Sequence, residues 1–416
     1  MKAKQMTYAA CCLMLAAVMI FSCTSCTLQA SAAKLSEGYS RRTAESGEIT
    51  DEFKKAMANF SFELFRGLIT KDDCNDMISP LSAVICLAMM ANGAGGNTKA
   101  QIEEAFCMDI ASLNKCLYAY TSSLYTSEDC KINLADSIWF RDTEGFHVNE
   151  EFLQNNADWY DAQIYSAPFD NGTVKDINAW CSQQTDKMID NIIDEIDPAD
   201  VMYLINALAF DAKWSVKYEK DNVKEGRFTS YGGTSSNVQM LSSKERTYIS
   251  SDGVTGFAKN YSGDKYSFVA LLPDEDTDIY GFANSLDGET WLSMWNSRRE
   301  ADVNVRMPEF TYDAKMNSKD TLMELGITDM FDEGTADFRP LGTCEGLNLY
   351  CSAIEQKVFV RVDRSGTKAA AITWGTMNKT SVPMTMFSVI LDRPFVYAIV
   401  DNATGLPLFL GAVTVL

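Results

Sequence analysis

The sequence has 416 residues, of which 46% are hydrophobic and 22% are charged, a composition that indicates a globular protein and excludes a disordered one. Its 57 acidic and 36 basic residues leave a formal net charge of −21. That acidity argues against nucleic acids, heparin-like polyanions and anionic lipids as partners, because these need clustered Lys and Arg. The single histidine, His147, excludes multi-histidine metal sites, and no nucleophile motif accompanies it. We therefore expect no catalytic residue, no metal and no cofactor.

Residues 1–32 are typical of an export leader. Two lysines precede an apolar run over 7–21, which is short for a membrane-spanning helix, and a small-residue cleavage site ends at Ala32. An alternative is a lipoprotein leader, because Cys23 and Cys26 each follow a serine. Either reading predicts export, with secretion in the first case and anchoring at the outer cell surface in the second.

Two further segments follow the leader. Residues 33–50 are polar and aperiodic, and we expect them to form a flexible tether. Residues 51–416 contain no linker rich in Pro, Gly or Ser, so we expect one domain there. Its eight cysteines permit either disulfides or buried thiols, and a domain of this size does not need disulfides.

Hydrophobic periodicity predicts the elements in chain order. Apolar residues three and four apart predict helices over 53–68 (with Asp51 as N-cap), 79–91, 102–106, 113–124 and 176–189. Apolar or alternating runs predict strands over 132–140, 201–210, 267–273, 303–307, 357–362, 395–401 and 408–415. Helices dominate the first half and strands the second, which indicates an α+β domain with helices packed on large antiparallel or mixed sheets.

The segment 366–386 differs from an ordinary loop between strands. It contains no proline up to residue 382, and its alternate residues from Thr367 to Gly375 are small and uncharged. Side chains alternate between the two faces of a strand, so this segment has one face that could be buried in a sheet. A long loop of this kind in a compact domain is often functional.

The sequence resembles the serpin family from about residue 52 to 416. The segments that carry the resemblance are 75–82, 91–99, 177–180, 204–214, 366–371, the stretch Asp392-Arg393-Pro394-Phe395, and 405–411. The resemblance implies an α+β serpin fold with about eight to nine helices, three β-sheets and an exposed reactive loop over about 364–383. It also implies a metastable native state.

Serpins are suicide inhibitors, mostly of serine proteases. The protease cuts the reactive loop, and the cut loop inserts into the main sheet and traps the acyl-enzyme. In the family the cut lies fourteen residues beyond the hinge glycine, which implies the bond Thr380–Ser381 here. A small β-branched residue at this position suits elastase-like or subtilisin-like proteases with a narrow neutral pocket, and Lys379 is an alternative for trypsin-like enzymes. We expect a monomer without a heparin-like cofactor.

The hinge departs from the family pattern. It comprises Arg364, Gly366, Thr367, Lys368, Ala369, Ala370 and Ala371. Arg364 stands where the family has an acid, and Glu309 stands where it has a base. We therefore expect an Arg364–Glu309 ion pair near Trp214, in the breach at the top of the sheet. The unusual charges leave open a non-inhibitory serpin that acts as a protease substrate, carrier or chaperone.

The shutter of the family, at the centre of the main sheet, corresponds to Ser79, Ser82 and Asn206. Gln356 stands where the family has a histidine. Glutamine both donates and accepts hydrogen bonds, so we expect this network to persist without a titrating group.

Overall fold

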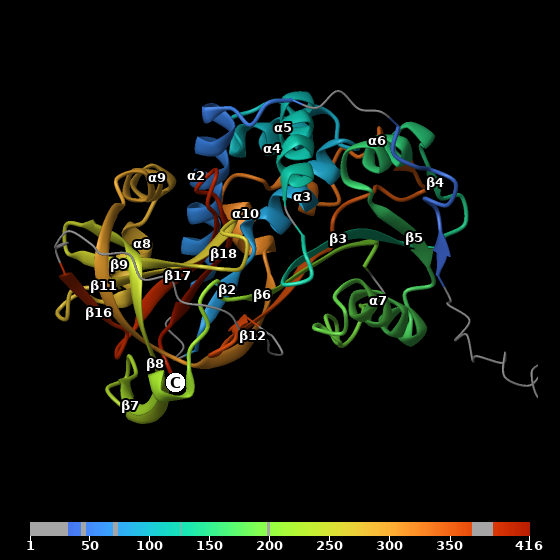
Figure 1. The fold of residues 1–416 in the computed structure, drawn as a ribbon. Coiled ribbons are helices and arrows are strands. Elements are labelled where there is room, and N and C mark those ends of the chain that lie inside the picture. The colour runs from blue at the N-terminus through green and yellow to red at the C-terminus, as the bar shows by residue number, and fades with distance from the viewer. Residues whose placement is uncertain (1–31, 43–46, 70–73, 125, 198–199, 368–385) are drawn as a thin grey trace, which may run out of the picture.

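The computed structural model of the protein describes residues 32–42, 47–69, 74–124, 126–197, 200–367 and 386–416 (Figure 1). In this part of the chain there are nine α-helices and three β-sheets. One continuous cluster of buried apolar side chains reaches from Phe53 to Val413.

The first sheet has seven strands. Their order across the sheet is β1 (Ala33–Lys34), β5 (Gln163–Ala167), β3 (Cys130–Arg141), β6 (Met202–Lys213), β15 (Gly366–Thr367), β14 (Ala353–Val362) and β12 (Phe310–Asn317). The sheet is mixed, because β3 pairs with β6 antiparallel whereas β6 pairs with β14 parallel.

The second sheet has nine strands. Eight follow the order β16 (Met386–Ile390), β11 (Arg299–Pro308), β8 (Ser235–Ser251), β9 (Val254–Asn260), β10 (Tyr266–Pro273), β17 (Phe395–Asp401), β18 (Pro407–Val413) and β2 (Asp76–Ile78), and β7 (Val223–Thr229) also pairs with β8. A small third sheet pairs β4 (His147–Val148) with β13 (Gly342–Thr343). His147 is exposed there.

The helices are α2 (Asp51–Leu68), α3 (Pro80–Ala91), α4 (Gly96–Ala105), α5 (Ile110–Ser123), α6 (Glu150–Tyr160), α7 (Asn171–Gln184), α8 (Ile279–Ser285), α9 (Gly288–Asn296) and α10 (Lys319–Glu324). Two 3₁₀ turns, η2 (Lys220–Asn222) and η3 (Asp329–Phe331), complete the elements. Each predicted helix and strand overlaps an observed one. Periodicity does not predict several other elements, among them α6, α8, α9, α10, β5, β7, β8, β9 and β12.

Local chemistry explains the first two helices. The hydroxyl of Thr50 accepts a hydrogen bond from Phe53 N–H at 3.1 Å, so Thr50 caps α2 and the predicted N-cap, Asp51, is its first helical residue. Pro80 opens α3 at a position where its missing N–H costs nothing. Every residue of α3 is buried, which makes it the central helix of the core.

The seven-stranded sheet is covered on both faces. Figure 1 shows α3 and α5 on one side of β3 and β6, and α7 on the other. On the α7 side, a separate apolar cluster joins Ile177 and Trp180 to Trp139 and Tyr203 of the sheet. The segment after α7 adds Ile192 to this cluster, so a second layer lies across the sheet.

The flexible tether predicted for 33–50 is wrong for its first half. Ala33 and Lys34 form β1 on the edge of the seven-stranded sheet, next to β5. Arg42 then makes an ion pair of 3.0 Å with Asp158 on α6. A polar, aperiodic sequence is compatible with this because backbone pairing and a single ion pair need no hydrophobic pattern.

The described cysteines include the buried thiols Cys86, Cys116, Cys130, Cys181 and Cys351.

Candidate functional site

A tight hairpin leads from β14 into the hinge. The backbone groups of Asp363 and Gly366 hydrogen-bond to each other in both directions, at 3.0 and 3.3 Å. The Asp363 carboxylate also accepts a hydrogen bond from Ser365 N–H at 2.7 Å. An aspartate that bonds to its own following backbone stabilises a turn, so this turn reverses the chain and directs it back into the sheet.

Gly366 and Thr367 lie between two strands of the seven-stranded sheet. They pair antiparallel with Lys213 and Ala212 of β6, and Thr367 also pairs with Val362 of β14. A Cβ atom on Gly366 would lie 2.2 Å from the carbonyl oxygen of Ala212, so only glycine permits this close approach. The first two hinge residues are therefore already strand residues.

Thr367 points into the core. Its side chain is 2% exposed, and its hydroxyl lies 2.8 Å from the hydroxyl of Tyr261. The predicted inward direction of Thr367 agrees with this geometry, and the rest of the small face stays a prediction. Lys368, Ala369, Ala370, Ala371, Lys379, Thr380 and Ser381 lie outside the described residues.

Below the hinge, β6 and β14 are not paired along their whole length. They pair directly over Tyr203–Ala207 and Ala353–Lys357, and β15 joins them at the top. Residues 208–211 of β6 and 358–361 of β14 lie between these two paired stretches. A strand that continued from Thr367 would enter the sheet along this line, which we call the opening line.

Trp214 packs under the hairpin, at the breach. Its indole N–H donates to the carbonyl of Asp363 at 2.8 Å, and its backbone N–H donates to Ser365 at 3.1 Å. The indole ring stacks on Tyr261 with 4.6 Å between ring centroids. Trp214 therefore connects the hinge hairpin to the core, and the predicted place of this residue beside the hinge is correct.

The expected Arg364–Glu309 ion pair is not formed. The Glu309 carboxylate accepts a hydrogen bond from the backbone N–H of Arg364 at 3.1 Å instead. Among the ion pairs of the described residues, none joins the Arg364 guanidinium to Glu309, and the Arg364 side chain is exposed. The two residues meet as predicted, but through the backbone, because the turn directs the arginine side chain into solvent.

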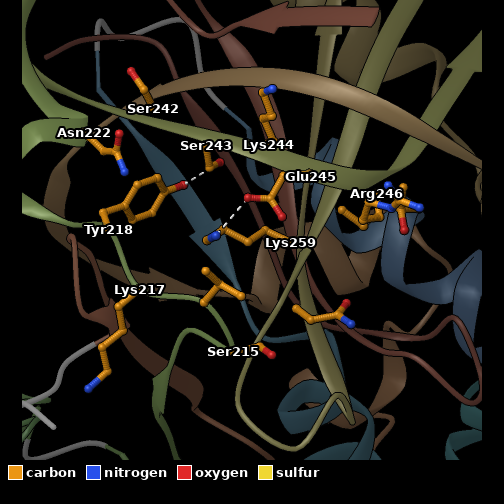
Figure 2. Close-up of a pocket in the computed structure, with 14 residues that line it drawn as sticks. Ser215, Lys217, Tyr218, Asn222, Ser242, Ser243, Lys244, Glu245, Arg246 and Lys259 are labelled. Carbon is orange, nitrogen blue, oxygen red and sulfur yellow. Dashed lines mark hydrogen bonds and ion pairs between the residues drawn. The ribbon is translucent and has the colours of Figure 1, made fainter. Parts of the chain in front are cut away.

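A buried ion pair lies beside the breach and was not predicted (Figure 2). Lys259 donates to Glu245 at 2.8 Å, and their side chains are only 3% and 12% exposed. The ammonium also lies 4.5 Å from the ring centroid of Tyr218 and 5.4 Å from that of Trp214. Lys259, Glu245 and Tyr218 line a cavity of about 390 Å³ next to the hinge. Glu245 and Lys259 are single charges in two separate strands, and nothing in the sequence indicates that they pair.

The shutter residues meet behind the sheet at the start of α3. Ser79 donates from its hydroxyl to Ser82 at 2.9 Å. Gln356 accepts from Ser79 N–H at 2.9 Å and donates to Ser79 C=O at 3.0 Å, so it uses both functions of its amide. Asn206 instead donates to Asp136 of β3. The network of Ser79, Ser82 and Gln356 therefore persists without a titrating group, as expected, whereas Asn206 lies outside that network and is bonded to an acid.

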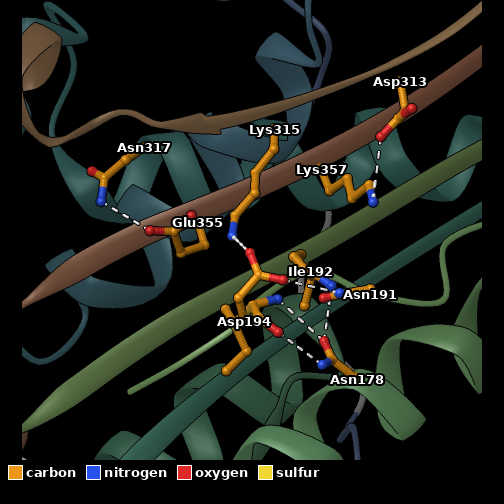
Figure 3. A network of polar contacts seen from close by, with 10 residues as sticks. Asn178, Asn191, Ile192, Asp194, Asp313, Lys315, Asn317, Glu355 and Lys357 are labelled. Carbon is orange, nitrogen blue, oxygen red and sulfur yellow. Dashed lines mark hydrogen bonds and ion pairs between the residues drawn. The ribbon is translucent and has the colours of Figure 1, made fainter. Parts of the chain in front are cut away.

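Residues 191–194, which follow α7, cross the lower half of the same sheet on its other face (Figure 3). We call this segment the polar strap. The segment after α7 is fixed by Asn178, whose amide donates to Ile193 C=O and accepts from Ile192 N–H, both at 2.8 Å. Asp194 then accepts a hydrogen bond from Lys315 of β12 at 3.1 Å. The strap thus joins α7 to β12, the strand beyond β14, at the level of the lower paired stretch of β6 and β14.

Two searches of the described residues complete the description. None of their helices has the length and apolar character needed to cross a membrane. No group of three or more His, Cys, Asp or Glu side chains within this part of the chain is arranged to hold a metal ion.

Comparison with known proteins identifies the family. The model of the serpin (serine protease inhibitor) family matches residues 55–415. The chain belongs to the serpin family. This serpin is 28% identical over 379 residues to the leukocyte elastase inhibitor of Equus caballus, covering 87% of this chain and 98% of that protein. It is 41% identical to the thermophilic serpin tengpin in its native state, with a TM-score of 0.89 and coverage of 93% and 100% of the two chains.

The serpin fold is also shared with proteins of low identity. Human thyroxine-binding globulin is 22% identical, with a TM-score of 0.78 and coverage of 88% of this chain and 98% of that one. The predicted family and fold class are confirmed, with nine helices and three sheets in the described residues. Serpins are mostly protease inhibitors rather than enzymes, and thyroxine-binding globulin, which shares the fold, is a protein whose structure was solved in complex with thyroxine.

Proposed function

We propose that this serpin is a suicide inhibitor of serine endopeptidases and that its scissile bond is Thr380–Ser381. The observation that supports the proposal is the hinge. Gly366 and Thr367 already pair as a strand with β6, at the top of an opening line along which β6 and β14 are incompletely paired. The residues that follow alternate with a small, uncharged face, so the chain can continue into the sheet.

The proposed reaction begins as ordinary proteolysis. The protease serine attacks the carbonyl carbon of Thr380, the peptide bond to Ser381 breaks, and the new amino group takes the proton. The acylated loop then inserts as a strand and carries the protease along. About a dozen new strand residues at ~0.5–1.5 kcal/mol per net hydrogen bond give a driving force on the order of 10 kcal/mol. A metastable native state supplies this energy, and trapping is effectively irreversible.

The proposed targets are proteases with a small neutral primary pocket, elastase-like or subtilisin-like. Threonine at the cleavage position supports this, as does the similarity to an elastase inhibitor. Lys379 offers a second register for trypsin-like enzymes. The net charge of −21 favours action without a heparin-like cofactor, and we propose a monomer that is exported by its leader to the exterior or to the outer cell surface.

The test is incubation with a panel of serine proteases. We expect an adduct stable in SDS, and a released peptide that begins at Ser381 and ends at Leu416 by mass spectrometry. Thr380→Arg should transfer the adduct to trypsin-like enzymes, because an arginine is recognised by a pocket carboxylate. Cleavage of the loop without any adduct across the panel would reject inhibition and favour a non-inhibitory serpin.

A further inference from the structure

Asp136 is a buried carboxyl group at the centre of the seven-stranded sheet. It lies directly opposite Asn206 in the β3–β6 register and is 6% exposed. Its Oδ1 accepts a hydrogen bond from the amide of Asn206. A buried carboxylate whose printed side-chain partner is one neutral amide is costly, because a single neutral donor offsets only part of the loss of hydration.

Asn206 is also incompletely bonded. Its side-chain oxygen is buried and has no hydrogen-bond partner among the described atoms. A carboxylate cannot donate to this oxygen, whereas a protonated carboxyl group carries one O–H donor. A single proton on Asp136 would therefore neutralise the buried charge and supply the donor that the Asn206 oxygen lacks.

The surroundings of Asp136 contain few groups that could compete for this proton. Cys86 faces it from α3 and Tyr160 from α6, and burial together with the Asp136 charge raises the pKa of both. Asp136 also lines a cavity of about 230 Å³, where Asp161 follows α6 and Arg41 approaches from the N-terminal segment. The α5 residues of this cavity, Thr121 and Ser122, are neutral. The cavity provides a route by which protons can reach the carboxyl group.

The position of Asn206 connects this pair to the opening line. Asn206 lies next to Gln356 in the β6–β14 register, at the lower paired stretch that must separate when a strand enters. We propose that Asp136 is a protonation switch, which holds the closed sheet when its proton is shared with Asn206 and weakens the closed sheet when that proton is lost. Its regulatory meaning rests on the proposed function, but its effect on the closed fold does not.

The direction of the pH effect follows from burial. Burial raises the pKa of Asp136 from 3.8 to about 7, and the hydrogen bond from Asn206 opposes part of the rise. A group whose pKa is higher in the folded state binds its proton more tightly there. The resulting stabilisation is complete below pH 3.8 and is lost as the pH rises toward 7. Over this interval the unfolding equilibrium shifts by up to roughly ten-fold per pH unit.

The test compares the wild-type protein with Asp136→Asn between about pH 5 and pH 8, without a protease. An asparagine can reproduce both hydrogen bonds of the protonated acid and cannot titrate. We expect the thermal midpoint of the variant to exceed that of the wild type by a margin that grows from pH 5 to 7 and then levels. Conversion of the wild type to loop-inserted forms should accelerate over the same range relative to the variant.

Asp161→Asn is the matched control, because it removes the same charge from an exposed residue of the same cavity. This variant should keep the wild-type pH profile. Parallel profiles for wild type and Asp136→Asn would overturn the proposal. If Asp136→Asn does not fold, infrared titration of the wild-type protein decides instead, because a buried protonated carboxyl band must disappear near pH 7. Failure to form a protease adduct would reject the proposed function and leave this result unaffected.

Discussion

Glu309 holds the hinge turn through the backbone of Arg364. The carboxylate accepts the Arg364 N–H at 3.1 Å, while the arginine side chain lies in solvent. At these two positions the acid and the base are interchanged relative to the family pattern. The interchanged charges nevertheless do not form an ion pair across the breach. The carboxylate acts as a hydrogen-bond acceptor for a turn, and the side chain at 364 is free to vary.

This contact predicts unequal effects at the two positions. Glu309→Ala should lower the thermal midpoint, because it removes a hydrogen bond worth ~0.5–1.5 kcal/mol, whereas Arg364→Ala should change little. Glu309→Gln retains an oxygen acceptor and is the control. In a double-mutant cycle, Glu309→Lys should not rescue Arg364→Glu. A coupling above about 1 kcal/mol would show that the side chains do pair.

Thr367 is the hinge residue that is already buried in the uncleaved sheet. Thr367→Arg would place an unpaired charge where the native side chain is 2% exposed, at a cost of several kcal/mol, on the order of that for other buried charges. Because the residue is buried before any cleavage, we expect the thermal midpoint of the uncleaved protein to fall. Thr367→Ser keeps the hydroxyl that faces Tyr261 and should keep the wild-type midpoint. An unchanged midpoint with Thr367→Arg would show that this side chain does not lie in the closed sheet.

The Lys259–Glu245 pair should support the base of the hinge. Glu245→Gln leaves a lysine with a 3% exposed side chain without its counter-charge, which typically costs about 3–5 kcal/mol. Replacing both residues with apolar ones, as in Lys259→Met with Glu245→Leu, should recover most of the loss. Lys244→Met, at an exposed residue of the same strand, serves as control. The measurement is the thermal midpoint of the single and double variants, and additive losses would contradict a coupled pair.

The polar strap should slow opening of the sheet. Separating β6 from β14 by one strand width, about 4.8 Å, would break the 3.1 Å contact between Lys315 and Asp194. Because both side chains are largely exposed, the effect is small and sensitive to salt. Asp194→Asn should accelerate conversion to loop-inserted forms by roughly two- to five-fold at low salt. Asp190→Asn is the control, because Asp190 is exposed and lies just before the strap. This variant should not accelerate the conversion, and an equal acceleration would indicate a general effect of charge.

The elements that could be predicted from sequence are those with a strong local pattern. The continuous apolar run of α3 and the strands β6, β10 and β17 lie where periodicity places them. The helices α8 and α9 and the strand β1 were missed, because short elements are stabilised by packing and pairing rather than by their own pattern. The same reason explains why residues 33–42 were mistaken for a tether.

The sequence by itself determined the family and predicted the start of the hinge at Gly366 and Thr367, because these depend on residue order and side-chain size. Only the tertiary structure decided which polar groups meet. Asp136 reaches Asn206 across strands 70 residues apart in the chain, and Lys259 reaches Glu245 across the neighbouring strands β8 and β9. A charge in a strand has no local signature of its partner, since burial and cross-strand neighbours arise only when the sheets are assembled. The burial of Asp136 beside Asn206 is therefore a property of the fold.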